Sequence, residues 1–112
     1  METANITNKA SANTSKEKID ALISIGAGRI VENALNKVIH FQLARYRNNI
    51  SQINDELARF EKNYKMSSEQ FYKKFEAGKL GDGEDFFEWS SLYENILLYK
   101  QRIKELESLG TE

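Results

Sequence analysis

Apolar side chains recur every three or four positions from residue 29 to residue 64, which is the period of an amphipathic helix. Over the second half of this stretch the spacings are four, three, four, three and four residues, the heptad pattern of a coiled-coil seam. A helix over Arg29–Asn63 would be about 50 Å long, so we expect it to lie along another helix. The first seam consists of Tyr46, Ile50, Ile53, Leu57 and Phe60, with Tyr64 following.

A second heptad pattern lies near the end of the chain, after the turn sequence Gly81-Asp82-Gly83. Its apolar positions are spaced by three, four, three, four and three residues. The pattern predicts a helix that ends near Leu109, with Gly110 as the stop. The second seam consists of Trp89, Leu92, Ile96, Tyr99, Ile103 and Leu106.

Between the two seams the sequence predicts one short helix. Ser67 and Gln70 stand three residues apart, as in a capping box that pairs each side chain with the other residue's backbone N–H. Phe71 and Phe75 would share a face of this helix, and Gly78 stands where a left-handed C-cap is favoured.

These elements predict an all-α fold, a long antiparallel helical hairpin with the short helix at its bend and coiled-coil-like packing between its arms. Two helices cannot bury every apolar side chain of such wide faces. We therefore expect an oligomeric bundle in which another chain covers the remainder. The apolar residues left over are Phe41, Leu43, Phe87, Tyr93 and Leu98.

The N-terminal part of the chain gives a weaker pattern. Residues 1–16 are small and polar, so they predict a disordered tail, and residues 17–112 predict a single helical domain. The apolar stretch Ile19–Ile25 fits either the start of a helix or a brief strand. Gly26-Ala27-Gly28 interrupts it and is interpreted as a hinge.

Composition narrows the function classes. The chain has 112 residues and no cysteine, which excludes disulfides, thiolate metal sites and cysteine nucleophiles. No apolar run approaches the roughly 20 residues of a membrane span. The N-terminus lacks the basic start and apolar stretch of a signal peptide, so we expect a cytoplasmic protein without membrane attachment.

Charge is distributed unevenly along the chain. Residues 1–50 hold seven Lys or Arg and four acids, a net of +3, whereas residues 51–112 hold nine and thirteen, a net of −4. This predicts an acidic patch that could bind a basic partner protein, with Phe87 and Tyr93 as apolar anchors. The acidic candidates are Glu76, Asp82, Glu84, Asp85 and Glu88.

Little in the sequence points to catalysis. The single histidine, His40, has no serine or acid placed to form a relay with it, although His40 and Arg45 could serve a helical nuclease. The acids from 82 to 88 lack the spacing of a calcium loop. We therefore predict no enzyme activity, no catalytic or metal site and no cofactor.

A third interpretation concerns the basic residues of the first long helix. They are typical of a solvated helix face, but an oligomer could align them into a stripe for nucleic acid. The residues are Lys37, Arg45, Arg47, Arg59, Lys62 and Lys65.

Residues 57–100 also resemble a set of small prokaryotic helical proteins that are often encoded beside a putative toxin and regarded as antitoxin-like. The stretches that carry the resemblance are Phe60-Glu61-Lys62-Asn63-Tyr64-Lys65-Met66-Ser67-Ser68-Glu69-Gln70-Phe71, then residues 73–82, then Asp85-Phe86-Phe87-Glu88-Trp89. This chain departs from the usual pattern at Lys65, where glycine is common. The resemblance implies a non-enzymatic protein that neutralises a toxin by protein–protein contact.

The sequence therefore predicts an antitoxin-like protein that binds a partner toxin through helix packing and an acidic patch, and that forms a homo-oligomer. An oligomeric nucleic-acid-binding regulator is the first alternative, and a helical nuclease is the second.

Overall fold

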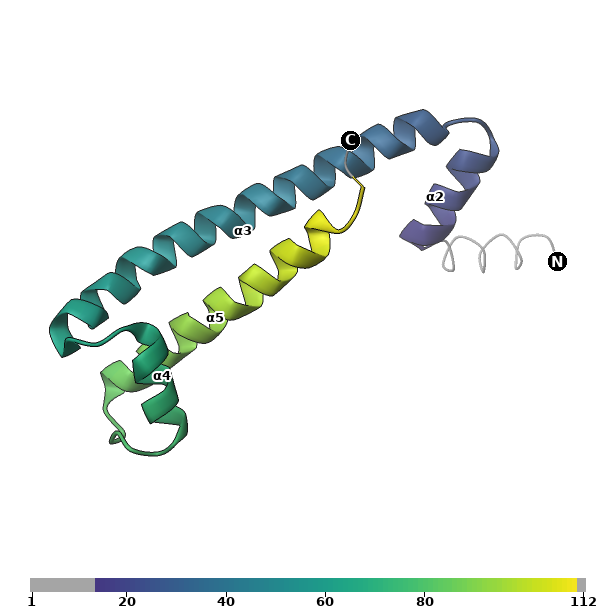
Figure 1. Cartoon of the computed structure of the whole chain (residues 1–112). Coiled ribbons are helices and arrows are strands. Elements are labelled where there is room, and N and C mark those ends of the chain that lie inside the picture. The colour runs from purple at the N-terminus through teal and green to yellow at the C-terminus, as the bar shows by residue number, and fades with distance from the viewer. Residues whose placement is uncertain (1–13, 111–112) are drawn as a thin grey trace. The chain divides into compact units, whose positions relative to one another are not determined.

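A computed structural model describes residues 14–110, and within them the backbone forms helices and no strand (Figure 1). This confirms the all-α prediction. Contacts between residues group the chain into two compact units, one up to Val38 and one from Ile39. The prediction of a disordered tail over 1–16 falls mostly outside the described residues, and the single domain over 17–112 stays a prediction. The helices are α2 (Ser15–Ser24), α3 (Gly28–Tyr64), α4 (Ser68–Glu76) and α5 (Glu84–Glu107).

In the first unit, local hydrogen bonds define both ends of α2. The Thr14 side chain accepts a hydrogen bond from the Glu17 backbone N–H, and the Glu17 carboxylate accepts one from the Thr14 N–H. At the other end Gly26 has φ +99°, and its N–H donates to the Ile23 carbonyl. The strand alternative for Ile19–Ile25 is therefore wrong, because α2 runs through Ser24.

Helix α3 matches the prediction of a helix over Arg29–Asn63, with one more residue at each end. It stops at Lys65, which has a left-handed φ of +55° and is the one non-glycine residue with positive φ in the described chain. A left-handed residue after the last turn ends a helix, and glycine is preferred there because it has no Cβ to crowd the carbonyl oxygen. The left-handed turn after α3 therefore forms with Lys65, although the antitoxin-like pattern usually has glycine at this position.

Replacing Lys65 with glycine is expected to raise the free energy of unfolding by about 0.5–1 kcal/mol, because glycine removes the left-handed strain but adds freedom to the unfolded chain. Urea denaturation followed by circular dichroism measures the change. Lys62→Gly is the matched control, since Lys62 is an exposed residue inside the last turn of α3. That variant should lose about 0.5–1 kcal/mol, and a loss of stability in Lys65→Gly would contradict the expectation.

The predicted caps of the short helix are present in α4. The Ser67 hydroxyl accepts from the Gln70 backbone N–H at 3.1 Å, and the Gln70 side-chain oxygen accepts from the Ser67 N–H at 3.2 Å. At the C-terminal end Gly78 has φ +70°, and its N–H donates to the Phe75 carbonyl. The capping box and the glycine stop are both confirmed.

Helix α5 begins directly after Gly83 and ends earlier than predicted. The predicted stop at Gly110 is wrong, because the last helical residue is Glu107 and Ser108 caps the end. The Ser108 hydroxyl donates to the Glu105 carbonyl at 2.6 Å, so a side chain replaces the expected glycine.

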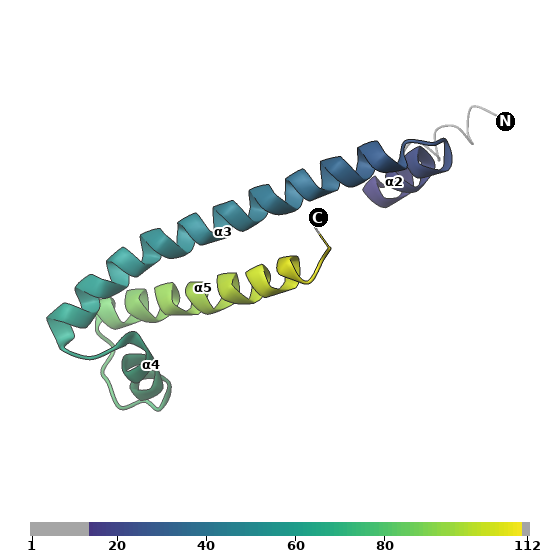
Figure 2. The ribbon, with the colours of Figure 1, turned by 45° about the horizontal axis from the view of Figure 1, so that its top comes forward.

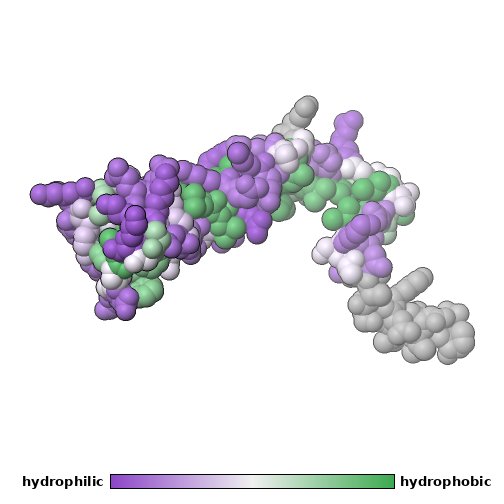
Figure 3. Space-filling model, turned by 60° about the horizontal axis from the view of Figure 1, so that its bottom comes forward, coloured by the Kyte–Doolittle hydropathy of each residue, from purple (hydrophilic) through white to green (hydrophobic). Residues whose placement is uncertain are grey.

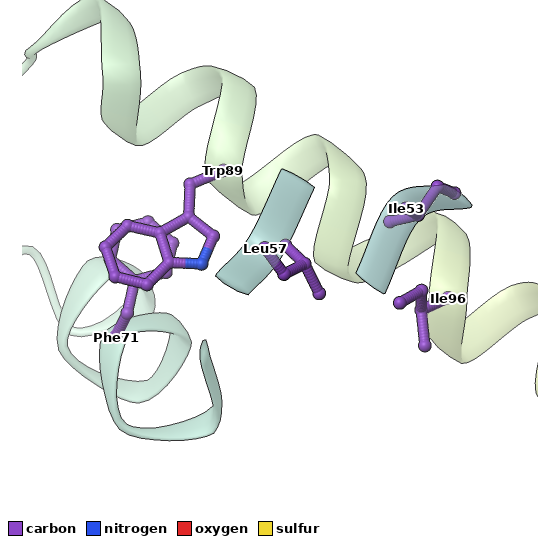
Figure 4. Packing of buried hydrophobic residues seen from close by; sticks show 5 residues of the cluster. All are labelled: Ile53, Leu57, Phe71, Trp89 and Ile96. Carbon is purple, nitrogen blue, oxygen red and sulfur yellow. The ribbon is translucent and has the colours of Figure 1, made fainter. Parts of the chain in front are cut away.

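The second unit is built around one hydrophobic core to which α3, α4 and α5 all contribute (Figure 4). Trp89 and Phe71 are fully buried at its centre, with ring centroids 3.9 Å apart and planes 3° apart. Figure 4 shows the indole stacked on the Phe71 ring, with aliphatic side chains of α3 and α5 continuing the core along the helices. The buried members are Ile53, Leu57, Phe71, Trp89 and Ile96.

Contacts between α3 and α5 run in opposite order along the two helices. Phe60, late in α3, stacks on Trp89 early in α5 with centroids 5.4 Å apart, and Tyr46 packs against Tyr99 at 5.3 Å. Figures 1 and 2 both show the second part of α3 beside α5, with α4 against the start of α5. The long antiparallel helical hairpin, its coiled-coil-like packing and the oligomeric bundle stay predictions.

Candidate protein-binding surface

All eleven seam residues are buried or half-buried within the second unit. Four belong to the buried core and four more pack against it. Tyr46 lies against Tyr99, and Ile103 and Leu106 are half-buried further along α5. The seams therefore contribute to packing within one chain, and a binding surface for another protein has to be sought among the exposed residues. The core and core-packing members are Ile50, Ile53, Leu57, Phe60, Trp89, Leu92, Ile96 and Tyr99.

The five acidic candidates are exposed and lie from the end of α4 to the first turns of α5. Glu84 and Asp85 occupy the first turn of α5, where the helix dipole favours negative charge. Of the described cations, none lies within ion-pair distance of these carboxylates; the pairs that do form involve other acids. The acidic residues Glu76, Asp82, Glu84, Asp85 and Glu88, together with Phe87, are called the acidic surface below.

Asp85 is exposed, but its carboxylate also accepts a hydrogen bond from another residue of the fold. The Tyr64 hydroxyl donates to its carboxylate at 2.7 Å and ties the end of α3 to the start of α5. The carboxylate raises the pKa of the Tyr64 phenol, chiefly through this hydrogen bond, because it stabilises the neutral phenol. Asp85 therefore contributes to the fold of the second unit, which makes it a poor choice for testing the acidic surface by mutation.

The two apolar anchors differ in exposure. Phe87 is 55% exposed and packs edge-on against Phe75, with ring centroids 5.7 Å apart. Tyr93 is half-buried and packs against Tyr72 at 5.1 Å. Tyr72 in turn donates to Glu94 at 2.7 Å, and that hydrogen bond raises the pKa of Tyr72 to about 12. Phe87 is therefore the more accessible anchor.

The residues of the nuclease alternative show no relay. His40 is exposed, and the Arg45 guanidinium donates to the Gln42 side chain at 3.1 Å and lies 6.0 Å from the Phe41 ring centroid. In the part of the chain that the structure describes, no three His, Cys, Asp or Glu side chains gather as a candidate metal site. Nothing in this geometry favours the nuclease interpretation.

Two basic residues of α3 that belong to the second unit, Arg47 and Arg59, have acidic neighbours. Arg47 donates to Glu107 at 2.6 Å, and Arg59 lies 4.0 Å from Glu56. Lys62 is exposed. Because two of the cations are opposed by carboxylates, the contacts do not favour the nucleic-acid stripe over a solvated helix face.

Sequence reasoning missed one buried polar group beside the core. Ser68 is buried, its hydroxyl donates to the Glu61 carboxylate at 2.8 Å, and the Trp89 indole N–H donates to the same hydroxyl at 2.9 Å. The Ser68 backbone N–H also donates to Glu61 at 2.8 Å. The only signal in the sequence was a second serine, Ser68, directly after the capping residue Ser67. From the sequence its side chain could have pointed either to solvent or to the core.

Comparison with models of known protein families, with curated proteins and with solved structures finds no match for this chain. The resemblance to antitoxin-like proteins is therefore untested. Among the described helices, none combines the length and the hydropathy that crossing a membrane requires.

Proposed function

We propose that the chain is a non-enzymatic, antitoxin-like protein that acts in the cytoplasm by binding a partner toxin through the acidic surface. The partner would present a basic area, as expected for a toxin that acts on RNA. Long-range attraction would speed the encounter, and the acidic side chains would then cover the basic area. The predicted helical hairpin, the coiled-coil-like packing of its seams and the homo-oligomer belong to this proposal.

The observation that carries the proposal is an exposed aromatic ring among carboxylates that have no ion-pair partner. From Glu76 to Glu94 the chain has six acids and only Lys79 as a base. Phe87 is more than half exposed in the middle of this stretch. An apolar anchor within a charged rim is the usual composition of a protein–protein contact.

Rigid support for this surface comes from the aromatic core beneath it. Phe86 packs against Tyr64 and Phe71, with ring centroids 5.3 and 5.7 Å apart. Phe75, which holds one edge of Phe87, stacks on Phe71 at 5.5 Å. Because these rings fix the start of α5 and the end of α4, little order has to be imposed on the surface when a partner binds.

The test uses the protein encoded by the adjacent gene as the partner. Asp82→Lys combined with Glu88→Lys is expected to weaken its binding at least about 10-fold at low salt, and the loss should shrink as salt screens the charges. Isothermal titration calorimetry at two salt concentrations measures the affinity. The circular dichroism spectrum should stay unchanged, since both side chains are exposed and neither forms an ion pair within the described residues.

Glu32→Lys combined with Asp55→Lys is the matched control, because both acids are exposed and the net charge changes by the same amount. If the two double variants lost the same affinity, the effect would come from net charge alone, and the acidic surface would be rejected as the binding site. Absence of any binding to the adjacent-gene protein would refute the toxin partner. Salt-dependent binding to DNA by the purified chain would instead favour the regulator alternative.

A further inference from the structure

Among residues 14–38, six of the eight Ile, Leu and Val side chains are exposed. Ile25 is 79% and Ile30 72% exposed, and Val31, at 8%, is the one buried hydrophobic residue among residues 14–38. Figure 3 shows hydrophobic surface in the region of α2 and the start of α3. The exposed residues Leu22, Ile23, Ile25, Ile30, Leu35 and Val38 are called the α2–α3 surface below.

Local structure holds this surface in place. The Ala27 N–H donates to the Leu22 carbonyl at 2.9 Å, and the Gly26 N–H donates to the Ile23 carbonyl at 3.1 Å. These two bonds form a Schellman motif, which sets the direction in which the chain leaves a helix. The Val31 N–H then donates to the Ala27 carbonyl, so α3 starts directly after the turn. The aliphatic residues therefore lie on α2, on the turn that follows it and on the first three turns of α3.

A helix pair of this size cannot form a sufficient core alone, since chains below about 40 residues usually need oligomerisation or cross-links. The exposed parts of the six side chains amount to roughly 700 Å², if a whole aliphatic residue is taken as on the order of 200 Å², compared with about 800 Å² per partner in a stable interface. The apolar area on the α2–α3 surface is thus of the size that a dimer would bury.

Charges around the α2–α3 surface suit a copy of the same chain. Within residues 14–38 the exposed charges are almost balanced, with four cations against three anions. Two copies of this unit can therefore meet without strong repulsion, whereas two copies of the acidic surface would repel each other. The cations are Lys16, Lys18, Arg29 and Lys37, and the anions are Glu17, Asp20 and Glu32.

We infer that a second copy of this chain covers the α2–α3 surface, in a two-fold dimer that brings each surface against its counterpart. Such an interface is isologous, so one self-complementary patch is enough to close it. This inference rests on the homo-oligomer of the proposed function and gives it a surface. It differs from the predicted bundle, whose seams are used within the second unit. The α2–α3 surface and the acidic surface have no residue in common.

The mass of the purified full chain in solution, measured by sedimentation equilibrium, tests the inference. The wild-type chain should behave as a dimer of twice 12.9 kDa. Ile25→Gln combined with Ile30→Gln should weaken dimerisation at least about 100-fold, because each dimer loses four buried aliphatic side chains. Both positions are so exposed that the helical content of the monomer should not change.

Leu97→Gln combined with Leu98→Gln is the matched control, since these leucines are about half exposed on α5. The control should keep the wild-type dimer. A monomeric wild-type chain at high micromolar concentration, or a dimer that only the control variant dissociates, would overturn the inference.

Cross-linking gives an independent readout, because the chain has no cysteine of its own. Ile25→Cys should form a covalent dimer with a short bismaleimide, and Leu98→Cys should not; the reverse pattern would reject the α2–α3 surface. The purified chain alone is used in these measurements. If the chain is monomeric but still binds the adjacent-gene protein, the toxin proposal is retained and the dimer is rejected. If the chain is a dimer but does not bind that protein, the dimer is retained and the toxin proposal is rejected.

Discussion

Replacing Trp89 with alanine should lower the free energy of unfolding by about 3–5 kcal/mol, the usual range for removing a large aromatic side chain from a core. Trp89 is fully buried and packs against Phe71, Phe60 and Tyr64, with ring centroids 3.9, 5.4 and 5.6 Å away. These rings come from α4 and α3, so the cavity would lie where three helices meet. The loss is a large fraction of the roughly 5–15 kcal/mol that holds a typical domain folded.

Circular dichroism during urea denaturation should measure this loss, because Trp89 is the only tryptophan and its fluorescence disappears with the substitution. Phe87→Ala is the matched control, two residues away on α5 and more than half exposed. It should cost less than about 1 kcal/mol. If both variants lost the same stability, the core would not be centred on Trp89.

Helix positions could be predicted because their signals are local. The alternation of three and four between apolar residues located α3 and α5, and the Ser67–Gln70 pair located the start of α4. Gly78 marked the end of α4 for the same reason, since a left-handed residue there needs no distant partner. The end of α5 was misplaced because a serine side chain capped it where glycine was expected.

Burial of individual side chains could not be predicted with the same success. Five apolar residues were left without cover by the sequence argument, and the structure divides them. Leu43 is buried and Tyr93 half-buried, whereas Phe41, Phe87 and Leu98 are exposed. Leu43 and Tyr93 stand three residues from the seam positions Tyr46 and Ile96, which fits the helical period, but they were left over together with Phe41, Phe87 and Leu98, which do not fit it. The distinction depends on which neighbouring helix lies above each residue, and that is set by tertiary packing.

Prediction of the candidate binding surface was limited for the same reason, because the contacts of its side chains depend on tertiary packing. Charge counting located a run of acids, but it could not show that Asp85 binds the Tyr64 hydroxyl while Glu88 has no such partner. The segment Gly26-Ala27-Gly28 was interpreted as a hinge because two glycines weaken a helix. The Schellman motif and the exposure of Ile25 became visible only with the backbone in place. A candidate binding surface therefore has to be located from exposure as well as from residue type.

Replacing Ser68 with alanine should cost about 2 kcal/mol, the second largest effect we expect, although only one oxygen atom is removed. The Ser68 hydroxyl links the Glu61 carboxylate to the Trp89 indole N–H, at 2.8 and 2.9 Å. Without it the buried indole N–H has no acceptor, and a buried donor left unpaired costs more than a hydrogen bond usually contributes. Urea denaturation of the variant measures the loss.

Ser90→Ala provides the matched control, because Ser90 is also buried but its hydroxyl donates only to the Phe87 carbonyl within the same helix. It should cost less than about 0.5 kcal/mol, since alanine favours the helix and no buried donor loses its acceptor. In a Trp89→Phe background, Ser68→Ala should cost about 1 kcal/mol less than in the wild-type chain, because phenylalanine has no N–H to satisfy. An unchanged cost in that background would mean that the Ser68 hydroxyl stabilises the fold through Glu61 alone, and that the indole N–H finds its acceptor elsewhere.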